Sequence, residues 1–166
     1  DEQRGRHAAS VVQVGVVVDP AGGALFHAQH GHGAFCTTDE GEARLHVAST
    51  ARLAGAYIVL GHHDRHPESR YLDIRRRMMA SGTAMRNFGS AALQLAHVAE
   101  GRYDGFVELE LSAWDAVAGL LLVEEAGAIV TDTAGQPWTV EHPSILAAAS
   151  PAMHRELLDL IAATVG

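Results

Sequence analysis

Two adjacent residues, Trp114 and Asp115, open the part of the chain with the most chemical content. The apolar stretch that follows, residues 116–123, predicts a helix whose first turn contains Asp115. A carboxylate at that position is stabilised by the helix dipole. It also offers oxygen ligands for a hard cation at a strand–helix junction, where α/β folds bind ligands. One carboxylate does not complete a metal site, so the residues alone favour the dipole-stabilising role.

Two further groups of residues precede Asp115. Residues 89–92, Gly-Ser-Ala-Ala, open a predicted helix, where small side chains let a ligand approach free backbone N–H groups. Close packing of the helix against a sheet would favour the same residues. Glu108 and Glu110 alternate on a predicted strand and therefore share a face. Such a pair most often faces solvent, and a role in binding a polar ligand is the alternative.

The histidine, cysteine and arginine patterns are less specific. Eleven histidines are present, and the close pairs at 30–32 and 62–63 are candidate ligands for zinc or nickel. No further ligand follows at a recognisable spacing, so structural or surface histidines are favoured. Cys36 has no helix start or histidine partner nearby and is expected to be a buried apolar residue. The three arginines at 75–77 predict a solvated helix face.

Composition bounds the class of protein. The chain has 166 residues, of which 48% are hydrophobic and 19% charged, as in a globular domain. A net charge of −8 argues against nucleic-acid or membrane partners. All 12 basic residues are arginine, which excludes lysine chemistry. A single cysteine forms no intrachain disulfide, so a reducing, cytoplasmic location is expected. No apolar run is long enough for a transmembrane helix.

Apolar periodicity divides the chain near residue 50 into parts that we treat as two domains, 1–50 and 51–166. In the first, strands are predicted at 11–18, 24–28 and 43–47, with a turn at 19–23 and an irregular crossing at 31–35. In the second, strands alternate with helices, as in a mostly parallel sheet covered by helices. The predicted strands are 56–60, 83–88, 106–111, 128–131 and 145–149, and the helices are 67–79, 90–99, 113–126 and one beginning after Ser150-Pro151. We therefore predict an α/β protein with a mixed, mostly parallel sheet and the remnant of an antiparallel sheet.

Several motifs in fixed order resemble the C-terminal half of the inositol monophosphatase family. The likeness extends over about residues 11–165. The motifs are Gly-Ser-Ala-Ala-Leu at 89–93, Val-Ala-Glu-Gly-Arg-Tyr-Asp-Gly-Phe at 98–106, Glu108, Trp-Asp-Ala-Val-Ala-Gly at 114–119, Glu-Ala-Gly-Ala at 125–128 and the turn at 132–135.

The resemblance implies a phosphomonoesterase that uses Mg²⁺ and is often inhibited by Li⁺, folded as part of a layered αβαβα sandwich. It implies that Asp115 is a ligand of the second metal ion and that Glu108 hydrogen-bonds a substrate hydroxyl. Gly89, Ser90 and Ala91 would line the substrate pocket. Inositol phosphate is the default substrate, and histidinol phosphate, sugar bisphosphates and nucleotide 3′-phosphates are handled by related sites.

Two family motifs with the other metal ligands, Glu-Glu and Asp-Pro-Ile-Asp-Gly-Thr, have no counterpart in this sequence. Residues 19–23, Asp-Pro-Ala-Gly-Gly, match a family hairpin turn instead. We therefore assign no catalytic residue and expect the chain alone to be inactive. We expect the chain to bind a small phosphorylated substrate. We also expect it either to form a homo-oligomer, as a dimer, or to pair with the N-terminal half. The alternative is a non-catalytic relative that acts as an interaction or dimerisation module.

Overall fold

The structure is a computed structural model that describes residues 12–62 and 68–164. Predictions that involve residue 11, His63 and the helix start at Pro67 lie outside these ranges. Nine strands and four helices occur in the described residues. The strands are β1 (Val14–Asp19), β2 (Ala24–Gln29), β3 (Gly33–Thr38), β4 (Gly41–Arg44), β5 (Tyr57–Leu60), β6 (Ala84–Arg86), β7 (Gly105–Glu108), β8 (Ile129–Thr131) and β9 (Ile145–Ala148). The helices are α1 (Glu68–Ala80), α2 (Ala91–Ala99), α3 (Ala113–Glu125) and α4 (Pro151–Ala162).

The first four strands form an antiparallel sheet in the order β1-β2-β3-β4. The predicted crossing at 31–35 is wrong, because most of it belongs to β3. Gly31 and Gly33 have φ angles of 76° and 93°, which glycine adopts without steric cost. They turn the chain tightly enough for β3 to pair with β2 at once. The third predicted strand, at 43–47, is displaced, since β4 spans Gly41–Arg44 and is fixed by its register with β3.

The other five strands form a mixed sheet in the order β6-β5-β7-β9-β8. β5 runs parallel to β6 and β7, and β9 runs antiparallel to β7 and β8. The apolar run of β9 is fully buried, as predicted for a strand covered on both faces. β7 is fully buried as well, and this includes Glu108, for which the sequence favoured a solvent-facing position. The predicted α/β class with a mixed sheet is therefore confirmed.

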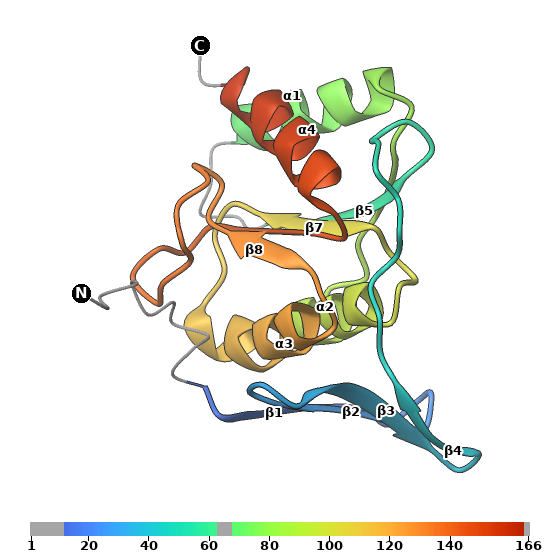
Figure 1. The fold of residues 1–166 in the computed structure, drawn as a ribbon. Coiled ribbons are helices and arrows are strands. Elements are labelled where there is room, and N and C mark those ends of the chain that lie inside the picture. The colour runs from blue at the N-terminus through green and yellow to red at the C-terminus, as the bar shows by residue number, and fades with distance from the viewer. Residues whose placement is uncertain (1–11, 63–67, 165–166) are drawn as a thin grey trace.

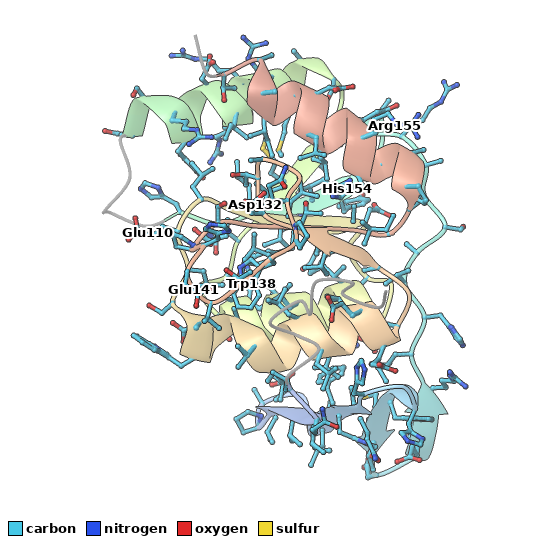
Figure 2. The ribbon with its side chains drawn as sticks, turned by 60° about the vertical axis from the view of Figure 1, so that its left-hand side comes forward. Glu110, Asp132, Trp138, Glu141, His154 and Arg155 are labelled. Atoms are coloured by element: carbon cyan, nitrogen blue, oxygen red, sulfur yellow. The ribbon has the colours of Figure 1, made fainter. Side chains whose placement is uncertain are left out.

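The elements stack in layers (Figure 1). Helices α2 and α3 lie between the two sheets, and α1 and α4 cover the opposite face of the five-stranded sheet. Within the middle layer, α2 and α3 approach closely at Gly119 of α3, where a Cβ atom would stand 2.7 Å from the Cβ of Leu95 in α2. Trp138 is almost fully buried and points between the five-stranded sheet and α3 (Figure 2). The core between the sheets contains residues from both sides of position 50, and the division into two domains stays a proposal.

The outer face of the four-stranded sheet carries exposed apolar side chains. Val14, Val16 and Val18 of β1 are 61%, 49% and 59% exposed, whereas Val17 between them is buried against the helices. Leu25 of β2 lies opposite Val18 and is 39% exposed. Within the described residues no layer covers this face (Figure 1). It is therefore an apolar surface of the kind that usually contacts another protein layer.

Other sequence predictions concern single residues. Cys36 is buried, as predicted, and burial raises the pKa of its thiol. The arginines at 75–77 are exposed on α1, also as predicted. Within residues 12–62 and 68–164, no helix has both the length and the apolar composition needed to cross a membrane.

Replacing Ser150 with Ala is expected to lower the free energy of unfolding by about 1 kcal/mol. The Ser150 hydroxyl caps α4 by accepting a hydrogen bond from the backbone N–H of Met153 at 3.2 Å, and it donates to the Thr50 carbonyl at 2.9 Å. Ser112 is the matched control, because it occupies the N-cap of α3 but makes no side-chain cap bond. Urea unfolding should show a clearly smaller loss for Ser112→Ala, and equal losses would contradict this account.

Candidate active site

A pocket of about 340 Å³ lies where the parallel strands end and two helices begin. The chain leaves β5, β6 and β7 at the same edge of the sheet, and α2 and α3 start beside it. Ligand sites of open α/β sheets form at this edge. The pocket is lined by His62, Asn87, Gly89, Ser90, Ala91, Ala92, Gln94, Glu108, Glu110, Leu111 and Asp115.

The structure brings together the residues that the sequence singled out. Gly89, Ser90, Ala91, Glu108 and Asp115 all line this one pocket, although they come from three separate segments. Glu110 joins them, as expected from its two-residue spacing from Glu108, although β7 already ends at Glu108. Asp115 is exposed in the first turn of α3. Their proximity supports a shared site, while the role of each stays a proposal.

The loop before α2 is held by Asn87, a residue that its sequence pattern did not single out. Asn87 Oδ1 accepts hydrogen bonds from the backbone N–H of Gly89 at 2.9 Å and from Nε2 of the buried Gln94 at 3.2 Å. Gly89 has a φ of 86°, which turns the chain into the helix. The Ser90 hydroxyl then accepts from the Leu93 N–H at 3.4 Å. Asn87 directly follows β6, but the predicted strand runs through residue 88, so no sequence signal marked this position.

His62 is another pocket residue whose place the sequence did not reveal. The sequence groups it with structural or surface histidines, and it is indeed exposed. Its ring packs against Tyr71 of α1, with 4.5 Å between the ring centroids, and it lines the pocket. His62 follows β5 as Asn87 follows β6, so both belong to the loops that leave the ends of the parallel strands.

Glu108 is the buried carboxyl group of the pocket. Its side chain is 6% exposed, and burial raises its pKa from the ordinary 4.5 to about 7. Its Oε1 atom is buried and makes no hydrogen bond within the described residues. A buried oxygen without a partner loses the hydrogen bonds that it makes in water, so such an atom in a pocket points to a ligand donor.

Glu108→Gln is expected to flatten the decline of stability between about pH 5 and 8. Because the folded-state pKa of Glu108 is raised, folding takes up a proton in this range, and the free energy of unfolding falls as pH rises through about 7. The shift corresponds to about 3 kcal/mol. Burial lowers the pKa values of His97 and His154, which destabilises the fold in acid. This loss of stability is expected to be the same in the parent protein and in Glu108→Gln. Urea unfolding across pH measures the difference, and parallel curves would contradict this origin.

The described residues do not form a complete metal site. Asp115, Glu108 and Glu110 line the pocket, yet no three His, Cys, Asp or Glu side chains within 12–62 and 68–164 are arranged to hold a metal ion. Among the described residues that line the pocket there is no arginine, and only His62 can carry a positive charge to pair with a phosphate. These residues suit hydroxyl groups of a ligand better than its phosphate.

Two other motif carboxylates stabilise turns instead of lining the pocket. Glu125, at the C-terminal end of α3, accepts hydrogen bonds from the backbone N–H groups of Gly31 and Gly33, both at 2.7 Å. Asp132 accepts from the N–H groups of Ala134 and Gln136, both at 2.8 Å, and lies apart from Glu110 in Figure 2. The Glu-Ala-Gly-Ala motif therefore joins α3 to the four-stranded sheet.

The sequence profile of the inositol monophosphatase family matches residues 8–166, which is almost the entire chain. The chain belongs to the inositol monophosphatase family. It is 41% identical over 138 residues to an inositol-1-monophosphatase of Mesorhizobium japonicum, covering 82% of this chain and 50% of that protein. It is 38% identical over 136 residues to the Nus factor SuhB of Pseudomonas aeruginosa, covering 80% of this chain and 49% of the relative.

Solved structures of this family share the fold. The inositol monophosphatase from Anabaena (Nostoc) superposes with a TM-score of 0.82 at 34% identity, covering 91% of this chain and 60% of that one. The chain spans about half the length of the curated relatives it matches. Family membership and fold are therefore shown, whereas the activity of the whole relatives is not thereby assigned to this chain.

Proposed function

We propose that this chain contributes the substrate-binding pocket and one metal-ligand carboxylate of an Mg²⁺-dependent phosphomonoester hydrolase of the inositol monophosphatase type. The observation that carries the proposal is the buried, unpartnered Glu108 oxygen in a pocket shared with Ser90 and Asp115. The substrate would be inositol phosphate or a related small phosphate ester, in the cytoplasm. Histidinol phosphate and nucleotide bisphosphates are the alternative substrates.

Each part of the pocket suits one part of such a ligand. Glu108 Oε1 would accept a hydrogen bond from a hydroxyl of the alcohol portion. The first N–H groups of a helix have no partner within the helix, so those of Ala91 and Ala92 in α2 are available to a polar ligand. Asp115 would contribute carboxylate oxygens of the kind that Mg²⁺ prefers. The small side chains at 89–92 keep the entrance open.

The metal ion would need ligands beyond this chain's described residues. Because Asp115 has no complete ligand set around it there, we derive no catalytic step through the metal. The resemblance places the remaining ligands in the N-terminal half of family proteins, and this chain covers about half of its relatives. We therefore propose that hydrolysis requires that other half, from the same or another polypeptide.

Two exposed apolar features support association with another protein layer. Trp114, next to Asp115, is 82% exposed, which is unusual for so large an apolar side chain. The exposed face of β1 and β2 is the second. A covering layer that reaches both would complete the stack beside the pocket. Homo-oligomerisation, as a dimer, is the alternative way to cover them.

A non-catalytic interaction module is the second candidate function. It is favoured by the incomplete metal site, and several relatives are named Nus factor SuhB instead of phosphatase. Titration with myo-inositol 1-phosphate, followed by NMR, separates the two candidates. The first requires shifts at residues 89–92 and 108, and at least tenfold weaker binding by Glu108→Gln. The second predicts no saturable shifts at these residues.

A further inference from the structure

We infer that Gly61 is a positioning residue for Glu108: the missing side chain at 61 is the space that the Glu108 carboxyl group occupies. This inference rests on the proposed function for its meaning, because Glu108 is there the residue that binds a substrate hydroxyl. Its geometry, however, stands independently of any activity.

Gly61 directly follows β5 and extends its pairing with β7. Its N–H donates to the carbonyl of Val107 at 2.8 Å, so the backbone at 61 is held against the strand that carries Glu108. A Cβ atom at Gly61 would overlap the Glu108 carboxyl group, with Oε2 in direct collision and Oε1 at 2.9 Å. No other described glycine faces an acidic side chain of the pocket in this way.

Backbone conformation does not account for the glycine at 61. Ten of the described glycines have positive φ angles, where side chains are disfavoured, but Gly61 is not among them. A larger residue would adopt its backbone conformation without strain, so the constraint is the space taken by the carboxyl group. This separates Gly61 from Gly89, whose φ of 86° is sufficient reason for glycine.

The space at Gly61 determines how deep the carboxyl group sits. Glu108 leans over the end of β5 and stays 6% exposed, with Oε1 buried and without a hydrogen bond. A methyl group at 61 would push the carboxyl group out toward the pocket. It would then be hydrated, and it would fill space where the alcohol portion of a ligand is proposed to bind. Gly61 therefore determines both how much of the pocket is open to a ligand and how deeply the Glu108 carboxyl group is buried.

Gly61→Ala tests the inference through a spectroscopic property of Glu108. In ¹³C NMR of the full chain, the side-chain carboxyl signal of Glu108 should titrate at least one pH unit lower in Gly61→Ala than in the parent protein. Gly105→Ala is the control, because a Cβ there would crowd the backbone carbonyl of Ala147 on the same sheet, not Glu108. It should leave the Glu108 titration unchanged.

A double-mutant cycle distinguishes positioning from general overpacking. Shortening the side chain in Glu108→Asp or Glu108→Ala removes the collision, so Gly61→Ala should lower the urea midpoint at most half as much in these backgrounds. Gly105→Ala should lower it equally in all backgrounds. An unchanged Glu108 titration, or equal losses from Gly61→Ala with and without the Glu108 side chain, would overturn the inference.

Failure of this inference and failure of the proposed function give different results. The titration and the cycle need neither substrate nor turnover, so they decide the role of Gly61 even if myo-inositol 1-phosphate does not bind. If that probe binds, Gly61→Ala should weaken its binding at least tenfold and Gly105→Ala less than threefold. Binding that is insensitive to Gly61→Ala would overturn the inference while leaving the proposed function intact.

Discussion

Hydrolysis of myo-inositol 1-phosphate is expected to appear when the chain is mixed with the N-terminal half of an inositol-1-monophosphatase relative in the presence of Mg²⁺. The chain alone should give only background phosphate release. The physical reason is the ligand set: Mg²⁺ requires several oxygen ligands, and within the described residues the pocket does not assemble a metal site around Asp115. Phosphate release over time, with and without the added half, measures the effect.

Asp115→Asn provides the decisive variant for this reconstitution. Loss of one anionic oxygen ligand should lower the reconstituted rate at least 100-fold, because a metal that activates a phosphate ester contributes several kcal/mol to the transition state. Asp159→Asn, on the exposed side of α4, removes the same charge far from the pocket and should leave the rate unchanged. Turnover by the chain alone, or a reconstituted rate insensitive to Asp115→Asn, would contradict the proposed division of the site.

Self-association of the chain is the second large expected effect. The exposed valines of β1 lie on an uncovered sheet face, and among the described residues β1 is also an edge strand of its sheet. At micromolar concentration the chain should therefore sediment as a dimer or larger species. The triple variant V14T/V16K/V18T should sediment as a 17.6 kDa monomer, since its substitutions change only outward-facing positions.

Met79→Lys is the matched control for this experiment. Met79 is 63% exposed on α1, which lies at the opposite end of the layered stack from the four-stranded sheet (Figure 1). Its replacement adds a charge without touching the exposed sheet face, so the variant should associate as the parent chain does. A sharp monomer peak for the parent chain would contradict the prediction. So would loss of association in Met79→Lys alone.

Local patterns predicted most of the elements because burial imposes them directly. Residues 56–60 and 145–149 are continuous apolar runs, and both contain strands buried between helical layers. Ser150-Pro151 predicted the start of α4, and its cap bond is present. β4 was misplaced because its residues, Gly-Glu-Ala-Arg, have no strand preference of their own. Its structure comes from pairing with β3, which is a tertiary effect.

Only the pocket residues that belong to recognisable motifs could be predicted from the sequence. Glu108 and Asp115 were singled out by residue type and position, and the structure places them in one pocket. Gly61 and Gln94 had no such signal. Gly61 matters through what is absent at that position, and Gln94 lies inside an apolar helix and is 2% exposed. The proximity of Gly61 and Glu108 depends on the pairing of two strands that lie far apart in sequence, which local patterns do not encode. The hydrogen bond between Gln94 and Asn87 depends on how the loop before α2 turns back onto the helix.

Helix α3 connects the pocket to the four-stranded sheet. Its 13 residues span about 20 Å, with Asp115 near its start and Glu125 at its end. The Glu125 carboxylate accepts hydrogen bonds from the backbone of the turn between β2 and β3. Because the backbone of a helix is hydrogen-bonded along its length, a shift of α3 along its axis moves both of its ends by the same distance. A partner that bound the exposed face of β1 and β2 and moved α3 in this way would therefore also move Asp115 relative to the pocket.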